Sequence, residues 1–217
     1  EEKLLPVRIP LFKGLIGMRL MFVHQDNADL LANVKSAEQL KKYIAGQGRN
    51  WPDTLLLKHH KFRLEEATNT KALLKMLSLK RIEYFPRSML EIWSEQSVLE
   101  NDQSIVVDQH IALRYPLAIY FFTSRENTKL AEIIERGLLT AIKDGSFDLL
   151  FNQFAGDKIR KSNLSSRTII NIDNPLMSQD TPLYIPELWF SPQEQAANSQ
   201  GPETHTEVKE TPPMQDE

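Results

Sequence analysis

Residues 115–154, YPLAIYFFTSRENTKLAEIIERGLLTAIKDGSFDLLFNQF, contain the pattern that decides the fold. The apolar run 117–124 predicts a buried strand. A long helix is predicted for residues 127–144, and Gly145 is a typical C-terminal stop for it. A second helical segment, 146–154, follows directly. A buried strand followed by helices is typical of a sheet that helices cover.

Strands and helices also alternate on either side of this stretch. Strands are predicted at 18–24, 44–46, 81–85, 104–108, 110–115 and 168–173, and helices at 36–43, 52–60, 69–80 and 87–97. The sequence therefore predicts an α/β fold with mainly parallel sheets covered by helices on both faces. In such sheets ligands bind beyond the carboxyl ends of the strands, where loops lead into helix N-termini.

Residues 43–60, YIAGQGRNWPDTLLLKHH, place a glycine-rich turn at such a strand-to-helix junction. Gly46 and Gly48 permit a close approach to the backbone, and the N–H groups before the helix that Pro52 begins favour an anion. Arg49 adds a fork-shaped donor suited to a carboxylate or phosphate. The turn lacks the spacing of a P-loop or a dinucleotide-binding fingerprint. The residues alone leave two interpretations open, an anion cradle and a plain turn with a solvated arginine.

Two further segments contain candidate ligand-binding side chains. Arg87 is predicted at the start of a helix after a strand, where it can either face a cleft or stack on Tyr84. Near the N-terminus, Arg8, Phe12 and Lys13 surround a proline in an extended segment. That alternation fits the wall of a pocket, and it also fits an edge segment whose cations extend into solvent.

The histidines and acidic residues show no catalytic or metal-binding spacing. His59 and His60 are adjacent, so on a helix they point about 100° apart and do not share an ion as an i, i+4 pair does. The chain contains no cysteine, which excludes disulfides and thiolate ligands. No G-x-S-x-G motif occurs, and the pair Glu91 and Glu95 is typical of a solvated helix face. We therefore expect no catalytic residue, no metal and no cofactor.

The formal net charge of −3 is unevenly distributed. Residues 192–217 hold six acidic residues and one lysine, so the remainder is slightly positive. A near-neutral body gives no footprint for nucleic-acid binding. The tail is rich in Pro, Gln, Glu and Thr and has no aromatic residue, so we expect it to be disordered. The longest apolar runs are too short to span a bilayer, and no membrane insertion is expected.

Four segments in this order resemble the bacterial extracytoplasmic solute-binding proteins of the amino-acid-binding type (family 3), which have the type II periplasmic-binding-protein fold. They are VRIPLFKGLIGMRLMFV (7–23), VKSAEQLKKYIAGQGRNWPDT (34–54), ALLKMLSLKRIEYFPRS (72–88) and residues 115–154. The last match is the most specific, because its helix, the Asp-Gly-Ser stop and the following aromatic helix keep the spacing of the family pattern. The resemblance spans about residues 5–155, and residues 171–190 match no part of the family pattern.

The resemblance implies two α/β lobes joined by strands that cross near residues 17–20 and 113–118. On this basis 1–18 is a remnant of lobe one with the first crossing, 19–114 is lobe two, 115–191 is the second crossing with the C-terminal part of lobe one, and 192–217 is the tail. The first strands and helices of lobe one would then precede Glu1. The chain is expected to be a fragment or an unusual half-molecule whose incomplete sheet exposes an apolar face.

The resemblance also implies a non-catalytic, periplasmic, monomeric protein that captures a small solute between its lobes and delivers it to a membrane transporter or a sensor. Arg87 replaces the family's acidic residue for a ligand amino group, and Gly48-Arg49-Asn50 replaces its anion loop, which together favour an anionic solute. The expected ligand-binding residues are Arg8, Phe12, Lys13, Gln47, Gly48, Arg49, Asn50, Trp51, Tyr84 and Arg87. The alternatives are a sensory or scaffold module of the same fold that binds a protein partner, and one domain of a larger enzyme.

Overall fold

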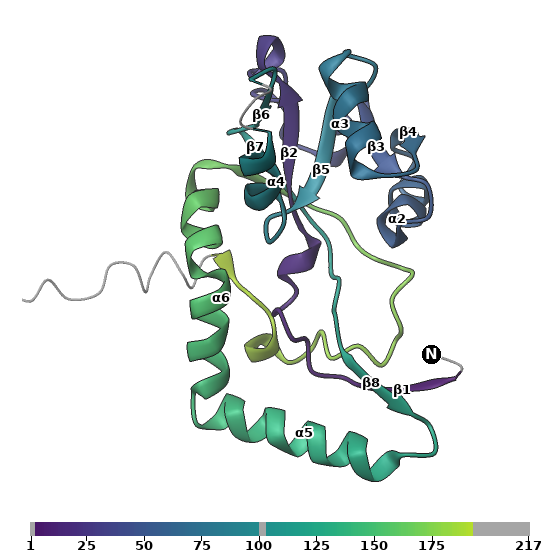
Figure 1. Ribbon diagram of the computed structural model, residues 1–217, viewed down its shortest axis with the longest axis vertical. Coiled ribbons are helices and arrows are strands. Elements are labelled where there is room, and N and C mark those ends of the chain that lie inside the picture. The colour runs from purple at the N-terminus through teal and green to yellow at the C-terminus, as the bar shows by residue number, and fades with distance from the viewer. Residues whose placement is uncertain (1–2, 100–102, 193–217) are drawn as a thin grey trace, which may run out of the picture.

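Strand β2, Met18–His24, lies in the middle of a seven-stranded sheet in the computed structural model, which describes residues 3–99 and 103–192 (Figure 1). All of its residues except His24 are buried, as expected for a strand covered on both faces. The strand order is β4-β3-β5-β2-β7-β9, and β6 also pairs with β2. The bounds are β3 (Ile44–Gly48), β4 (Arg63–Ala67), β5 (Tyr84–Ser88), β6 (Ile105–Val107), β7 (Ile111–Arg114) and β9 (Thr168–Asn171).

Helices cover both faces of this sheet, and together they form the larger lobe. Residues of α3 (Thr70–Ser78) and α4 (Ile92–Val98) join one buried cluster, and residues of α1 (Ala37–Leu40) and α2 (Pro52–His59) join the other. The start signals behave as predicted: Ser36 Oγ accepts a hydrogen bond from Gln39 N, and Pro52 begins α2. The α/β fold predicted from the sequence is confirmed.

The direction of each pairing follows the connections between strands. β3 runs parallel to β4 and β5, and α2 and α3 form the crossovers between them. β7 and β9 are also parallel, whereas β2 runs antiparallel to β5, β6 and β7. The sheet is therefore mixed around its central strand. The pattern RLEEA of β4 is too polar to predict a strand, and it forms one at the sheet edge because β3 supplies the hydrogen-bond ladder.

The predicted helix start at Arg87 is wrong. Strand β5 continues through Ser88, because it pairs with β2 along its whole length with Arg19 opposite Ser88. Helix α4 begins only at Ile92. Arg87 therefore lies on a buried strand and not in the first turn of a helix.

A smaller lobe contains the antiparallel strands β1 (Leu4–Val7) and β8 (Phe121–Ser124) with α5 (Thr128–Lys143) and α6 (Ser146–Ser162). Gly145, between the two helices, has φ = +82°, which confirms the predicted stop. The prediction of a buried strand over 117–124 is wrong, because a sheet of two strands is too narrow to bury both faces. In the described residues, the large apolar side chains left exposed on this lobe are Leu4, Ile119, Phe121, Phe122, Leu130, Ile133, Leu139, Leu149, Leu150 and Phe154.

Helix α6 is longer than predicted and returns the chain to the larger lobe (Figure 1). Its 17 residues span about 25 Å, and Trp93 Nε1 of α4 donates to Ser162 Oγ at its end at 3.2 Å. Residues 168–171 then form β9 in the larger sheet, not in lobe one where the resemblance places them. Short 3₁₀ turns lie at Leu15–Gly17, Gln25–Asn27, Leu164–Ser166 and Pro186–Leu188.

Residues 172–191, called the return segment below, run from β9 back along the junction of the two lobes (Figure 1). Ile172 N donates to Arg114 O at 2.9 Å, and Phe190 N donates to Lys13 O at 2.8 Å. In the residues that the structure describes, no helix combines the length and the apolar character needed to cross a membrane.

The two crossing segments lie side by side where the lobes join. Met18 is opposite Arg114 in the β2–β7 ladder, and Tyr115 N donates to Gly17 O at 3.1 Å. A Cβ atom at Gly17 would lie 2.1 Å from Tyr115 O. Only glycine therefore allows the two backbones to approach this closely.

We expect Gly17→Ala to lower the free energy of unfolding by about 1–3 kcal/mol, because the added methyl group meets backbone that cannot rotate away. Gly137→Ala is the matched control: no atom lies within 4 Å of a Cβ at that exposed position in α5, so we expect a gain of about 0.5–1 kcal/mol. Urea denaturation measures both. Equal stability of the two variants would contradict the close approach of the crossing segments.

Candidate functional site

The turn between β3 and α2 follows the carboxyl end of a strand, as predicted. Arg49 N donates to Ala67 O at 2.9 Å, and Trp51 N donates to Gly48 O at 3.0 Å. These two backbone N–H groups are used inside the protein, while the side chains of Arg49 and Asn50 are exposed. These two N–H groups are therefore not available to form an anion cradle. A ligand at this turn would instead contact the side chains of Arg49 and Asn50.

Trp51 covers one side of the turn. A Cβ atom at Gly48 would lie 2.2 Å from the indole, so the ring packs directly on the glycine. The ring also stacks with Phe85, with centroids 6.1 Å apart, and the Arg87 guanidinium carbon lies 4.8 Å from the indole centroid. Gly48 is thus required for the packing of Trp51, whether or not the turn binds a ligand.

Arg87 is buried and paired with acidic residues of the segment that follows it. Its Nε and Nη2 donate to the Glu95 carboxylate at 2.5 to 3.1 Å, and Glu91 Oε2 lies 3.3 Å from Nη2. The acidic pair is therefore not a simple solvated helix face, since both carboxylates lie near Arg87. This neutralises the positive charge that the sequence suggested for a solute.

A second buried arginine connects the turn to both crossing segments. Arg19 of β2 forms an ion pair with Asp53 of α2 at 2.5 Å, and its guanidinium carbon lies 5.4 Å from the centroid of the Tyr115 ring. Burial alone would lower the pKa of Arg19, but Tyr115 and Asp53 raise it. Burial raises the pKa of the Tyr115 hydroxyl well above its usual range. The pair is charged and the phenol neutral, so this contact links α2 to the first and second crossings.

The remaining candidate residues do not gather at the turn. Gln47 and Tyr84 are buried, with 1% and 0% of their surface exposed, and neither presents its side chain to solvent. Arg8 pairs with Asp180 of the return segment at 3.1 Å. Lys13 pairs with Asp148 of α6 at 2.5 Å, and Phe12 lies against Phe154 with centroids 5.3 Å apart. Among the four candidate cations, only Arg49 is exposed without an ion pair in the described residues.

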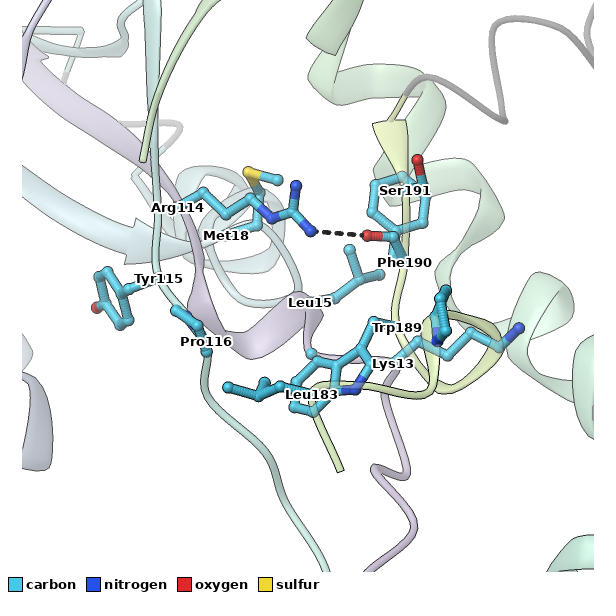
Figure 2. A pocket seen from close by; sticks show the side chains of 12 residues that line it. Lys13, Leu15, Met18, Arg114, Tyr115, Pro116, Leu183, Trp189, Phe190 and Ser191 are labelled. Atoms are coloured by element: carbon cyan, nitrogen blue, oxygen red, sulfur yellow. Dashed lines mark hydrogen bonds between the residues drawn. The ribbon is translucent and has the colours of Figure 1, made fainter. Parts of the chain in front are cut away.

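A cavity of about 300 Å³ lies at the junction of the lobes. Figure 2 shows it between the first crossing (Leu15, Met18), the second crossing (Arg114, Pro116) and residues 183–191 of the return segment. The Arg114 side chain points across it, and Nη2 donates to Phe190 O at 3.3 Å (Figure 2). Lys13 also lines the cavity, and its ammonium group pairs with Asp148 of α6. The described residues contain no group of three His, Asp or Glu side chains suited to a metal ion.

No protein-family model and no curated protein matches this chain. Among solved structures, it is similar to an amino-acid ABC transporter substrate-binding protein from Streptococcus pneumoniae bound to L-arginine, with 13% identity, coverage of 71% of this chain and 62% of that chain, and a TM-score of 0.50. The chain has the type II periplasmic-binding-protein fold. It spans less than two thirds of the length of that relative.

Two further structures align over similar shares with TM-scores just below 0.5. One is an ancestral arginine-binding protein bound to glutamine (17% identity, 68% of this chain, 62% of that chain, TM-score 0.49). The other is the periplasmic VFT2 domain of BvgS from Bordetella pertussis (18%, 70%, 61%, TM-score 0.48). At identities this low, the similarity concerns the fold and does not extend to the ligand or the function.

Sequence reasoning missed four residues that organise this fold at the lobe junction: Arg19, Asp53, Arg114 and Tyr115. One signal was available. Arg19 is the only charged residue between Gly14 and Val23, and an arginine inside a buried strand requires an acidic partner. The partner itself could not be identified, because Asp53 is 34 positions away and resembles an ordinary acidic residue in a helix first turn.

Proposed function

We propose that this chain is the solute-binding part of a non-catalytic, periplasmic protein that encloses a small solute between two lobes and passes it to a membrane transporter or a sensor. The single observation that carries this proposal is the Arg19–Asp53–Tyr115 contact. It joins the helix that follows the glycine-rich turn to both crossing segments. A solute at the turn can therefore shift the hinge, as lobe closure requires.

The proposed contact residues are Gly48, Arg49, Asn50 and Trp51. Arg87 packs its guanidinium against the Trp51 ring. Arg8, Lys13 and Arg87 already have carboxylate partners, so they add no net positive charge to a cleft. Arg49 is the exposed cation that remains. We propose that it pairs with one negative group of the solute. A zwitterion such as the L-arginine of the Streptococcus pneumoniae protein satisfies this requirement as well as an anion does.

The test is a thermal-shift screen of the full chain with L-amino acids, dicarboxylates and short peptides, followed by calorimetry on the hits. A solute at 100 times its Kd adds about 2.7 kcal/mol of stability, which raises Tm by about 5 °C or more. We expect Arg49→Gln to weaken binding about tenfold or more, and Arg81→Gln, another exposed arginine of the larger lobe, to leave it unchanged. Equal binding by both variants would rule out the turn as the site.

A second candidate function is favoured by the exposed apolar side chains of the smaller lobe. A groove of about 540 Å³ between β8, α5 and α6 is lined almost wholly by apolar residues, including Phe121, Leu150 and Phe154. Apolar patches of this kind are typical of protein interfaces. A scaffold or sensory module that binds a protein partner is therefore the alternative, and the absence of any stabilising solute in the screen would favour it.

A further inference from the structure

The cavity at the lobe junction contains a cation whose donors are largely unused. Arg114 is half-buried, and its guanidinium donates one hydrogen bond, from Nη2 to Phe190 O at 3.3 Å. A guanidinium has five N–H donors. Within residues 3–99 and 103–192, no carboxylate lies within ion-pair distance of Arg114. In this respect Arg114 differs from Arg8, Lys13, Arg19 and Arg87, each of which has an acidic partner.

Apolar side chains form the larger part of the cavity wall, beside Lys13 and Ser191, and they are held in place. Leu15 and Met18 are buried in the first crossing, and Pro116 lies in the second. Trp189 closes one side: its Nε1 donates to Pro182 O at 2.9 Å, and its ring lies 2.5 Å from the position of a Cβ at Gly14. Gly14 has φ = +73°. These contacts form the wall before any ligand arrives, which lowers the entropic cost of binding.

We propose that this cavity binds a small monocarboxylate with an apolar body, whose carboxylate pairs with Arg114 and whose body lies against Leu15, Met18 and Trp189. An arginine paired with a carboxylate in a partly desolvated site forms charge-assisted, bidentate hydrogen bonds. A volume of about 300 Å³ holds about ten non-hydrogen atoms at roughly 30 Å³ each. Lys13, the other cation of the lining, is already paired with Asp148. Arg114 therefore suits one negative charge, and a second would be left without a partner.

This site is separate from the turn before α2, so it goes beyond the proposed function and does not depend on it. Its ligand contacts both crossing segments and the return segment, and its residues differ from Arg49, Asn50 and Trp51. Substitutions at the two sites can therefore be read independently.

The test is calorimetry of the full chain with hexanoate and benzoate, each compared with its uncharged amide. We expect each acid to bind at least tenfold more tightly than its amide. We also expect Arg114→Gln to raise the Kd of each acid at least tenfold. Leu183→Phe is the second variant. Leu183 lines the cavity but is 52% exposed, so its substitution narrows the cavity without disturbing the core, and we expect it to weaken both acids.

Arg49→Gln is the control for the other site, and we expect it to bind hexanoate as the unaltered chain does. Loss of hexanoate binding in Arg49→Gln but not in Arg114→Gln would overturn the proposal and assign the carboxylate to the turn. Acid affinities unchanged in both Arg114→Gln and Leu183→Phe would overturn it. Failure of both acids to bind at concentrations up to about 10 mM would overturn it as well.

Discussion

Arg167→Ala is expected to lower the free energy of unfolding by about 3–5 kcal/mol, the cost of removing one partner from a buried ion pair. Arg167 and Asp108 have no exposed side-chain surface, and Nη1 lies 3.7 Å from Asp108 Oδ2. The same guanidinium donates to the carbonyl oxygens of Ser162 at 2.6 Å and Asp108 at 2.5 Å. The substitution therefore leaves the buried Asp108 carboxylate without its counter-charge and the carbonyl groups without the donors of Arg167.

The position of Arg167 explains why this loss should be large. Ser162 is the last residue of α6, Asp108 follows β6, and Arg167 directly precedes β9. One side chain thus connects the helix from the smaller lobe to two strands of the larger sheet. Burial raises the pKa of Asp108, although the backbone N–H groups of Ile111 and His110 and the charge of Arg167 oppose this rise.

Urea denaturation measures the effect, with Arg160→Ala as the matched control. Arg160 also lies near the end of α6, but its ion pair with Asp157 is exposed, so we expect a change within about 0.5 kcal/mol. A loss for Arg167→Ala no greater than for Arg160→Ala would show that the buried pair does not hold the two lobes together.

Asp53→Ala should lower the free energy of unfolding by about 3 kcal/mol, at the lower end of the range for a broken buried pair. Arg19 would stay buried without its 2.5 Å partner, and Glu91, 3.9 Å from Nη1, compensates only in part. Asp53 also lies in the first turn of α2, where its charge interacts favourably with the helix dipole. Both effects act in the same direction.

A double-mutant cycle separates a specific pair from general loss of packing. The cycle consists of Arg19→Met, Asp53→Leu and the variant with both substitutions. The double variant removes both charges of the pair, so we expect it to be more stable than Asp53→Leu alone. Asp26→Ala, which removes an exposed carboxylate paired with Lys80, is the surface control. If the losses in the free energy of unfolding of the two single variants add up to the loss in the double variant, Arg19 and Asp53 do not interact.

Much of the secondary structure was predictable because its signals are local. The central strand β2 has the predicted bounds, α5 lies within one residue of its predicted ends, and Gly145 ends it with positive φ. Caps, stops and apolar periodicity involve neighbours a few positions apart. Strand β5 and the exposed β8 could not be predicted in the same way, since their ends and burial depend on a partner strand or on how much of a sheet is present.

The candidate site was predictable only in part, for a related reason. The glycine-rich turn lies at the carboxyl end of β3, where the alternation of elements predicted it. The charge of the site depended on pairs such as Arg87 with Glu95 and Lys13 with Asp148, and the second of these joins residues more than a hundred positions apart. Sequence spacing counts cations, whereas only the folded chain shows which of them are neutralised.

By itself the sequence determined the α/β class, the central strand, the long helix with its stop and the turn before α2. Each of these follows from backbone preference and from the periodic burial of apolar side chains, which neighbouring residues specify. Only the tertiary structure decided that Arg19 bonds Asp53, that Trp51 packs on Gly48, and that Arg114 faces a cavity closed by Trp189. The physical reason is that ion pairing and cavity shape depend on distances between residues far apart in the chain, and folding alone sets those distances.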